Sequence, residues 1–296
     1  MDRTAASLTP RLRFKTLASG SGGNASILIA LLADPATGER TRHTTLIDGG
    51  LPPKTLSRAL KEAGLHYRDV DDVLLTHLDH DHAHVAAMTS DKLRAPLHIH
   101  RRHLGRAERM GLLRHPTQPF DHEPFELTPQ LRVSSVLLDH DQLGVAAFRI
   151  DCDSIGRSLA FATDLGRPTR ALEQHLRGVD LLAIESNYCP EMQRASDRPA
   201  FLKRRIMDGA GHLSNEQATG VVRATRPREH VVLLHLSRQC NTPELASSAH
   251  DGASYQLTLT HQREPTPWID LPARAPRQLP RVASMRQGLL FGATTA

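Results

Sequence analysis

Short apolar runs separated by polar or glycine-rich stretches recur along most of this chain, and the pattern predicts a fold rich in strands. Residues 12–17 alternate between apolar and polar positions, and residues 26–30 form the expected antiparallel partner after a glycine-rich loop. Further strands are predicted at 44–47, 73–75, 96–100, 131–138, 145–150, 159–163, 179–184 and 231–234. Two strand-rich halves with flanking helices indicate two sheets packed between helix layers.

Helices are predicted where apolar residues recur three or four positions apart. Residues 53–64 carry such a stripe and end at a glycine, and residues 82–93 and 101–113 are the next helical segments. A further helix begins at Ser214, because the order Ser-Asn-Glu-Gln supplies a capping side chain at its start.

Metal-ligand residue types recur where the predicted apolar strands end. These residues are His77, His140, Asp164, Glu185 and His235. Because polar side chains repeated at strand ends come together at the edge of a sheet, they predict one shared site.

The densest group of such residues is the stretch 77–82, with the sequence His-Leu-Asp-His-Asp-His. In an extended segment His77, Asp79 and Asp81 point to one side, and His82 follows as the chain turns. His80 faces away from them. Imidazoles and carboxylates at this spacing suit a pair of divalent metals. The alternative is a solvated strand end that happens to be rich in His and Asp.

Composition narrows the class of protein. The 296 residues are 39% apolar, enough for a substantial core. No run of about 18 apolar residues and no signal sequence is found, so we expect no membrane span and a cytoplasmic location. Three widely separated cysteines favour core thiols over a disulfide framework. The net charge of +5 favours a polyanionic partner only slightly, because much of the excess lies near the C-terminus.

The motifs together resemble the metallo-β-lactamase-fold hydrolases and, within them, the YycJ (WalJ) branch. The metal motif is His77-Leu78-Asp79-His80-Asp81-His82, followed in order by His140, Asp164 and His235. The branch-specific segments are 17–24, Ala162-Thr163-Asp164, Glu185-Ser186-Asn187, 211–215, His235-Leu236-Ser237 and Asn241-Thr242-Pro243. The resemblance implies an α+β fold, a four-layer αββα sandwich with a dinuclear site between its sheets. It also implies a phosphodiesterase that acts on DNA, as a 5′-to-3′ exonuclease.

The resemblance also implies a ligand set. The first metal would take His77, Asp79 and His140, the second Asp81, His82 and His235, and Asp164 would bridge the two. The chain departs from the branch at two positions, where Asp79 and Tyr188 stand in place of histidines. A carboxylate at position 79 adds negative charge, which moves the preference of the two divalent metal ions from zinc toward manganese or iron.

Catalysis is expected to use a hydroxide held between the two metals, with Asp81 and His212 as the catalytic residues. His212 would contact a phosphate or protonate the leaving group, and the alternative is a purely structural histidine. The candidate substrate-binding residues are Ser19, Ser21, Asn24, Asn187, Ser214 and Asn215. The loop 19–24 either aims backbone N–H groups at an anion or is an ordinary hairpin connection.

Other functions fit the same residues. A small-molecule hydrolase of the same fold, acting on a thioester or a lactone, would use the same metals. Flavodiiron proteins also carry a carboxylate at the second motif position, but they need an additional flavodoxin domain for which we expect no room in this chain. A non-catalytic scaffold is disfavoured by the full ligand set.

Composition changes near residue 263, so we expect a hydrolase domain over 1–262 and a Pro/Arg-rich flexible tail over 263–296. Within the tail, Gln287, Leu290 and Phe291 resemble the peptides with which bacterial repair and replication enzymes dock on the sliding clamp. The alternative is that these residues fold back over an apolar strip. DNA and the clamp are therefore the expected partners, and the oligomeric state is left open.

Overall fold

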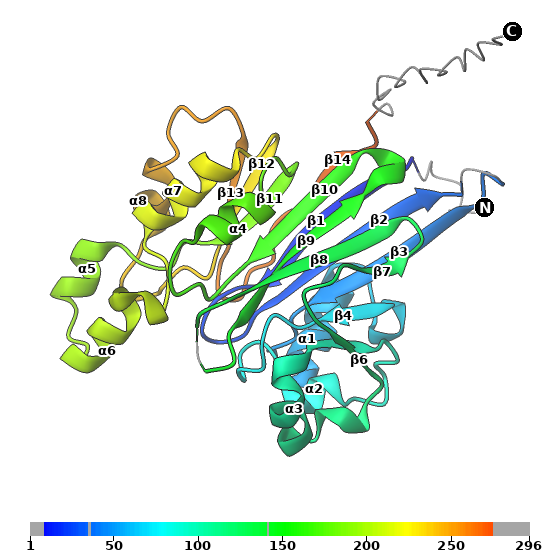
Figure 1. Cartoon of the computed structure of the whole chain (residues 1–296), viewed down its shortest axis with the longest axis horizontal. Helices are drawn as coiled ribbons and strands as arrows, with labels where there is room; N and C mark the ends of the chain where they lie inside the picture. Colours follow the sequence, from blue (N-terminus) through cyan, green and yellow to red (C-terminus); the bar gives the residue numbers. More distant parts are fainter. Residues whose placement is uncertain (1–8, 35–36, 141, 275–296) are drawn as a thin grey trace, which may run out of the picture.

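The computed structural model describes residues 9–34, 37–140 and 142–274, which form two facing sheets of seven strands each (Figure 1). In spatial order the first sheet contains β14 (Ile269–Pro272), β1 (Arg11–Ala18), β2 (Ala25–Ala33), β3 (Arg40–Ile47), β4 (Asp72–Leu74), β5 (Leu97–His100) and β6 (Thr117–Phe120). The second contains β13 (Gln256–Leu259), β12 (His230–Leu234), β11 (Leu181–Glu185), β10 (Arg157–Ala162), β9 (Val145–Cys152), β8 (Leu131–Leu138) and β7 (Phe125–Thr128).

Within each sheet, the pairing of neighbouring strands changes once, from antiparallel to parallel. The first sheet is antiparallel from β14 to β3 and parallel from β3 to β6. The second is antiparallel from β7 to β10 and parallel from β10 to β13. The carboxyl ends of β10, β11 and β12 therefore meet at one edge, as ligand sites of parallel sheets require.

The central core follows from the two-residue period of the strands. In β2, Leu28 and Ala30 face the other sheet, whereas Ile27 and Ile29 face the outer helices. Phe14 from β1 and Phe161 from β10 meet between the sheets, with ring centroids 6.4 Å apart. Both sheets thus bury one face against each other and one face against helices, which explains why β2, β11 and β12 are apolar on both sides.

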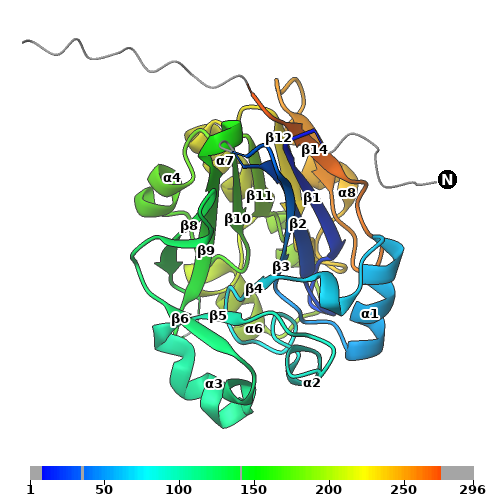
Figure 2. The same cartoon turned by 90° about the vertical axis from the view of Figure 1, so that its right-hand side faces the viewer.

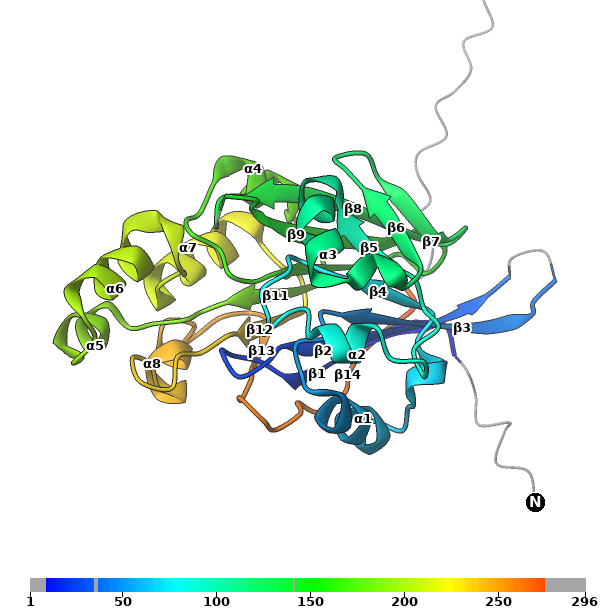
Figure 3. The ribbon, with the colours of Figure 1, turned by 90° about the horizontal axis from the view of Figure 1, so that it is seen from below.

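The helices form the two outer layers (Figures 2 and 3). The first sheet is covered by α1 (Pro53–Glu62), α2 (Val85–Met88) and α3 (Leu104–Met110). The second is covered by α4 (Arg170–His175), α7 (Asn215–Thr225) and α8 (Pro243–Ser248). Figure 3 shows α1 and α4 on opposite outer sides of the sandwich. The predicted αββα architecture is therefore confirmed.

Two further helices, α5 (Pro190–Ala195) and α6 (Ala200–Arg205), project at one end of the sandwich (Figure 1). They share a small apolar cluster with Tyr188, Ile206 and Cys240. None of the helices in the described ranges has the length and apolar character needed to cross a membrane.

The structure corrects two expected elements. The helix predicted over 82–93 shrinks to α2, because residues 79–82 form a turn in which the N–H groups of His82 and Ala83 donate to the carbonyl of Asp79. The tail does not begin at Arg263, because β14 pairs with β1 along the edge of the first sheet. The candidate clamp peptide with Gln287, Leu290 and Phe291 lies outside the described residues.

Candidate metal centre

The predicted ligands come together at the edge of the sandwich where several strands end. His77 follows β4 of the first sheet, whereas His140, Asp164 and His235 follow β8, β10 and β12 of the second. All four side chains are largely or fully buried. The site therefore joins the two sheets, and its ligands are 158 residues apart at the extremes, from 77 to 235.

The first group of ligand atoms consists of His77, His140 and Asp164, whose donor atoms lie within 4.8 Å of one another. Asp79 lies beside this group, with Oδ2 3.7 Å from His77 Nε2 and 3.9 Å from His140 Nε2. His77 Nε2 is also 3.6 Å from Asp164 Oδ2. The structure thus brings together the residues expected at the first metal.

The second group consists of Asp81, His82 and His235, again within 4.8 Å of one another. Asp81 Oδ2 is 3.8 Å from His82 Nε2 and 4.0 Å from His235 Nε2. Asp164 connects the groups, since its Oδ2 is 2.5 Å from His82 Nε2 and 3.6 Å from His77 Nε2. Asp164 therefore lies between the two groups of candidate ligand atoms.

The donor atoms fit divalent cations. Within the described residues, His77 Nε2, His140 Nδ1 and His235 Nε2 are buried and make no hydrogen bond. Buried polar atoms are normally satisfied, so unsatisfied nitrogens that converge on carboxylates point to an absent partner of positive charge. Imidazole and carboxylate donors are the ligands that zinc, manganese and iron accept.

Asp48, which sequence reasoning did not assign to the site, holds two of the ligands. Its carboxylate accepts hydrogen bonds from Thr76 N and Thr76 Oγ1, and it lies 2.7 Å from His82 Nδ1. Thr76 Oγ1 in turn lies 3.0 Å from His77 Nδ1. Both imidazoles therefore present Nε2 to the cations, because Nδ1 is engaged behind them. The signal was available, since Asp48 directly follows an apolar strand.

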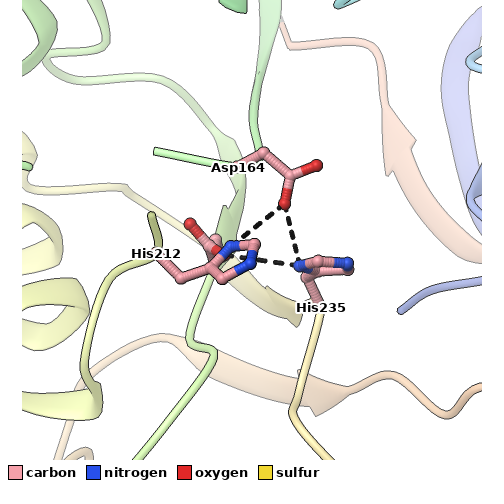
Figure 4. A group of neighbouring side chains, drawn as sticks. Asp164, His212 and His235 are labelled. Carbon is pink, nitrogen blue, oxygen red and sulfur yellow. Dashed lines mark hydrogen bonds and ion pairs between the residues drawn. The ribbon is translucent and has the colours of Figure 1, made fainter. Parts of the chain in front are cut away.

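Asp164, His212 and His235 lie together at the other wall of the site (Figure 4), and Glu185 lies beside His212. His212 Nδ1 is 2.6 Å from Glu185 Oε1 and 3.2 Å from Asp164 Oδ1. Burial alone would lower the pKa of His212, but the carboxylates of Glu185 and Asp164 outweigh it and raise that pKa to about 10. The same competition, with Asp164 as the main carboxylate, raises the pKa of His235 to about 9.

Glu185 anchors His212, a role that the sequence did not assign to it, although its position at a strand end had placed it in the predicted site. Glu185 Oε2 accepts hydrogen bonds from Leu165 N at 2.8 Å and from Leu213 N at 3.3 Å. Glu185, Asp164, His212 and His235 also lie close enough to hold a cation. Because both carboxylate oxygens of Glu185 already accept from protein donors, we assign it to positioning and not to ligation.

Asp79 is held by a residue from outside the motif. Arg106 of α3 donates from Nη2 to Asp79 Oδ1 at 2.7 Å, which leaves Oδ2 toward His77 and His140. The neighbouring His77 imidazole, together with Arg106, keeps the pKa of Asp79 well below its ordinary value although burial opposes this. His80 is exposed, and its ring packs on His84 at 4.7 Å. The expectation that His80 faces away from the ligands is confirmed.

Backbone strain is concentrated at this centre. Among the described residues other than glycine, four have positive φ: Asp48 (59°), Asp164 (51°), His235 (56°) and Arg226 (52°). The first three directly follow strands and line or support the cation sites. A left-handed conformation costs such residues about 1–3 kcal/mol each, so its retention here is typical of functional positions.

The candidate substrate-binding residues divide into two sets. Ser19, Asn24, Ser214 and Asn215 are buried and make hydrogen bonds inside the protein. Ser19 Oγ accepts from His235 N at 2.8 Å, and Asn24 Nδ2 lies 2.9 Å from His82 Nε2. Ser214 caps α7 as predicted, and Asn215 bonds to Asn241. These four side chains therefore support the ligand loops, and their role as substrate contacts stays a prediction.

Ser21 and Asn187 belong to the other set, because they line a pocket of about 330 Å³ together with His212 and His235. The exposed Ser21 forms part of its rim, whereas Asn187 donates from Nδ2 to His235 O at 2.7 Å. Tyr188, which replaces a histidine of the branch, is buried against Ile206 and Cys240. It therefore packs beneath α5 and α6.

Two adjoining sets of imidazole and carboxylate donors, at the edge of an αββα sandwich and open to a pocket, define the class of metal-dependent hydrolases. The family model described as "Beta-lactamase superfamily domain" matches residues 34–236. The chain belongs to this superfamily, as a hydrolase of its metallo-β-lactamase-fold members.

Known proteins with related sequences or folds agree with this assignment. Exodeoxyribonuclease YycJ of Bacillus anthracis is 29% identical over 241 residues, which cover 79% of this chain and 86% of that protein. The metallo-β-lactamase-fold protein YhfI of Bacillus subtilis superposes with a TM-score of 0.62 at 14% identity, over 86% of this chain and 99% of YhfI. A diphosphatase of the PhnP family gives a TM-score of 0.60 at 15% identity, over 88% and 98%.

Proposed function

We propose that this protein is a dinuclear metal-dependent phosphodiesterase that degrades DNA as an exonuclease with 5′-to-3′ polarity. The observation that carries the proposal is the position of Asp164, whose Oδ2 lies near Nε2 of His77 in one ligand group and of His82 in the other. The similarity to a protein named exodeoxyribonuclease supports DNA as the substrate.

The predicted ligands fall into two sets, one for each cation. His77, Asp79 and His140 would hold one cation, Asp81, His82 and His235 the other, and Asp164 both. When bound, such cations polarise phosphoryl oxygens and lower the pKa of water. The protein supplies the positions of these donors, and Asp48 and Thr76 fix which imidazole nitrogens face inward.

His212 is the candidate for direct contact with the substrate. Glu185 holds its Nδ1, so Nε2 is the ring nitrogen left for a phosphoryl oxygen or for the leaving oxygen. Its place in the wall of the 330 Å³ pocket, next to His235, gives it access to a substrate there. It would donate a hydrogen bond to the reacting phosphate or a proton to the departing group.

The decisive experiment compares duplex DNA labelled at the 5′ or the 3′ end, in the presence of Mn²⁺, Fe²⁺ or Zn²⁺. Wild-type protein should release 5′-labelled mononucleotides first, and Asp81→Ala should lose several orders of magnitude in rate because a cation ligand is removed. Asp153→Ala is the matched control, since the Asp153 side chain is 88% exposed and lies away from the strand ends that carry the ligands.

Small substrates distinguish the proposed phosphodiesterase from the alternative, a small-molecule hydrolase. Bis-p-nitrophenyl phosphate, a thioester and a lactone are assayed beside the duplex with the same preparations. Turnover of the thioester or lactone without action on any phosphodiester would contradict the proposal and identify a small-molecule hydrolase. Release of the 3′ label first would contradict the polarity alone.

A further inference from the structure

Arg198 lies in the link between α5 and α6 and lines the same pocket as His212 and His235. It is half-buried. The pocket therefore has His212 and one of the predicted ligands, His235, on one part of its wall and a guanidinium group on another. No function derived so far uses this residue.

The guanidinium is held rigidly by three neutral groups. Its Nε donates to Gln239 Oε1 at 3.0 Å, its Nη1 to Gln193 Oε1 at 3.1 Å, and its Nη2 to Ser237 Oγ at 3.3 Å. These bonds fix the orientation of the planar group without neutralising it. A guanidinium fixed in this way is ready to bind an anion without further ordering.

The absence of a carboxylate partner sets Arg198 apart. Within 9–34, 37–140 and 142–274, Arg198 forms no ion pair, whereas Arg157 and Arg274 both pair with Asp180 and Glu229. A partly buried arginine usually has such a partner. Its uncompensated charge therefore indicates that the partner is an anion supplied from outside the chain.

Gln193, which accepts a hydrogen bond from Arg198, has one polar atom left unsatisfied within the described residues. The side chain of Gln193 is fully buried, and its Nε2 makes no hydrogen bond within the described residues. Its Oε1 instead accepts from Arg198. A buried amide with an unsatisfied donor needs an explanation, and the explanation here is the fixed placement of Arg198.

The rim of the pocket contributes a second kind of anion donor. The exposed Ser21 belongs to the loop between β1 and β2, and its backbone N–H has no hydrogen-bond partner in the part of the chain that the structure describes. Backbone N–H groups in glycine-rich loops commonly bind phosphate oxygens. Arg198 and Ser21 thus offer donors of the type that phosphate accepts.

We propose that Arg198 forms a subsite for a second phosphate group of a polynucleotide, next to the phosphodiester that enters the ligand cluster. The inference rests on the proposed function and specifies its substrate as a chain with more than one phosphate. A guanidinium matches the geometry of phosphate through paired N–H donors. Arg198 makes no bond to His212 or to any ligand, so its phosphate is not the reacting one.

The test uses thymidine dinucleotides joined by an uncleavable, uncharged methylphosphonate, with a terminal phosphate at the 5′ end, at the 3′ end, or at neither. Calorimetric titration into metal-loaded protein measures how much the terminal phosphate tightens binding. In the wild type we expect a gain of about 10- to 100-fold at one of the two ends, because a charge-assisted hydrogen bond contributes on this scale.

Arg198→Met should abolish this gain. Arg198→Lys should retain part of it, because lysine keeps the positive charge but lacks the paired N–H donors of the guanidinium group. Arg132→Met is the matched control, since Arg132 is exposed at the start of β8 and should leave the gain unchanged. Thermal unfolding of each variant separates loss of binding from loss of fold.

Cleavage rates of dinucleotides with an ordinary phosphodiester test the subsite independently of the binding measurement. Arg198→Met should lower kcat/KM on the dinucleotide with a terminal phosphate by at least about tenfold more than on the one without it. An equal gain from the terminal phosphate in wild type and Arg198→Met, or no gain at either end, overturns the inference. A wild type that cleaves no phosphodiester, but whose terminal-phosphate gain still depends on Arg198, refutes the proposed function and leaves the subsite standing.

Discussion

At the scale of single residues, the centre differs from the family motif by one carboxylate. Asp79 takes a position that the motif gives to histidine, and Arg106 holds one of its oxygens. Arg106 pairs its positive charge with the negative charge of Asp79, so the surroundings of this position suit a carboxylate. The resemblance located this residue, but Arg106 is 27 positions away and no local pattern connects the two.

Asp79→His tests the effect of this carboxylate on the metals. The wild type should contain close to two transition-metal ions per chain and work at least as well with manganese or iron as with zinc. In the variant, the ratio of zinc-supported to manganese-supported activity should rise, because an imidazole is a softer donor. Elemental analysis and rates with each metal measure this. Activation of the wild type by zinc alone, with no change in the variant, would contradict the assignment.

Asp48→Asn tests the groups behind the ligands. The variant keeps the size of the side chain but weakens its acceptance from Thr76 and His82. Residues that orient ligands commonly contribute about 10- to 100-fold to metal affinity. We expect a loss of this size in competition with a chromophoric chelator, with a near-normal circular dichroism spectrum. Unchanged affinity would show that Asp48 serves the loop and not the cations.

At the scale of elements, most strands and the antiparallel pairing of β1 with β2 were predictable, whereas β6, β7, β13 and β14 were not. The two-residue alternation in β1 and the buried runs of β2, β11 and β12 are properties of short segments, so the sequence located them. β14 was missed because its partner, β1, lies more than 250 residues earlier in the chain. Several prolines in and around β14 also made a strand there hard to predict. Glu185 and Asp48 were visible at strand ends, but their roles depend on neighbours from other strands.

Asp72 links three strands of the first sheet and makes stability depend on pH. Its carboxylate lies 2.5 Å from His98 Nε2 and 3.1 Å from His43 Nε2. Burial would raise the pKa of Asp72, but the two histidines lower it below the ordinary value. Its contribution is therefore fully present above the unfolded-state pKa of about 4 and is lost as pH falls through the folded-state value.

Asp72→Asn should accordingly lower the free energy of unfolding by about 1–3 kcal/mol at pH 7, the scale of charge-assisted hydrogen bonds. The difference from the wild type should shrink as the pH falls below about 4. Urea unfolding of both proteins at several pH values measures it. If the difference in the free energy of unfolding between the two proteins stays constant down to the lowest pH, the shape of the Asp72 side chain, and not its charge, stabilises the protein.

At the scale of the whole molecule, the sandwich brings both ends of the described chain to one place. β14 pairs with β1, and Arg274 pairs with Asp180 and Glu229 of the second sheet, so the last described residue joins the two sheets. Beyond this residue, the sequence predicts that Gln287, Leu290 and Phe291 bind a sliding clamp.

A peptide spanning residues 286–296 should bind the clamp of the same organism with a Kd in the micromolar range. Leu290→Ala with Phe291→Ala should abolish binding, because these side chains supply the apolar contact. Fluorescence anisotropy of the labelled peptide measures this, and the full-length double variant should hydrolyse small phosphodiesters at the wild-type rate. Loss of thermal stability in that variant would instead place these residues in the fold.

The bond between Ser19 and His235 has a consequence for synthesis of the protein on the ribosome. Ser19 is translated early and His235 late, yet the hydroxyl of Ser19 holds the backbone of His235. A nascent chain that has not yet reached residue 235 lacks one cation ligand, and one that has not reached residue 272 leaves the β1 edge unpaired. The second group of ligand atoms therefore cannot assemble before residue 235 has emerged from the ribosome, long after residues 77–82 have been made.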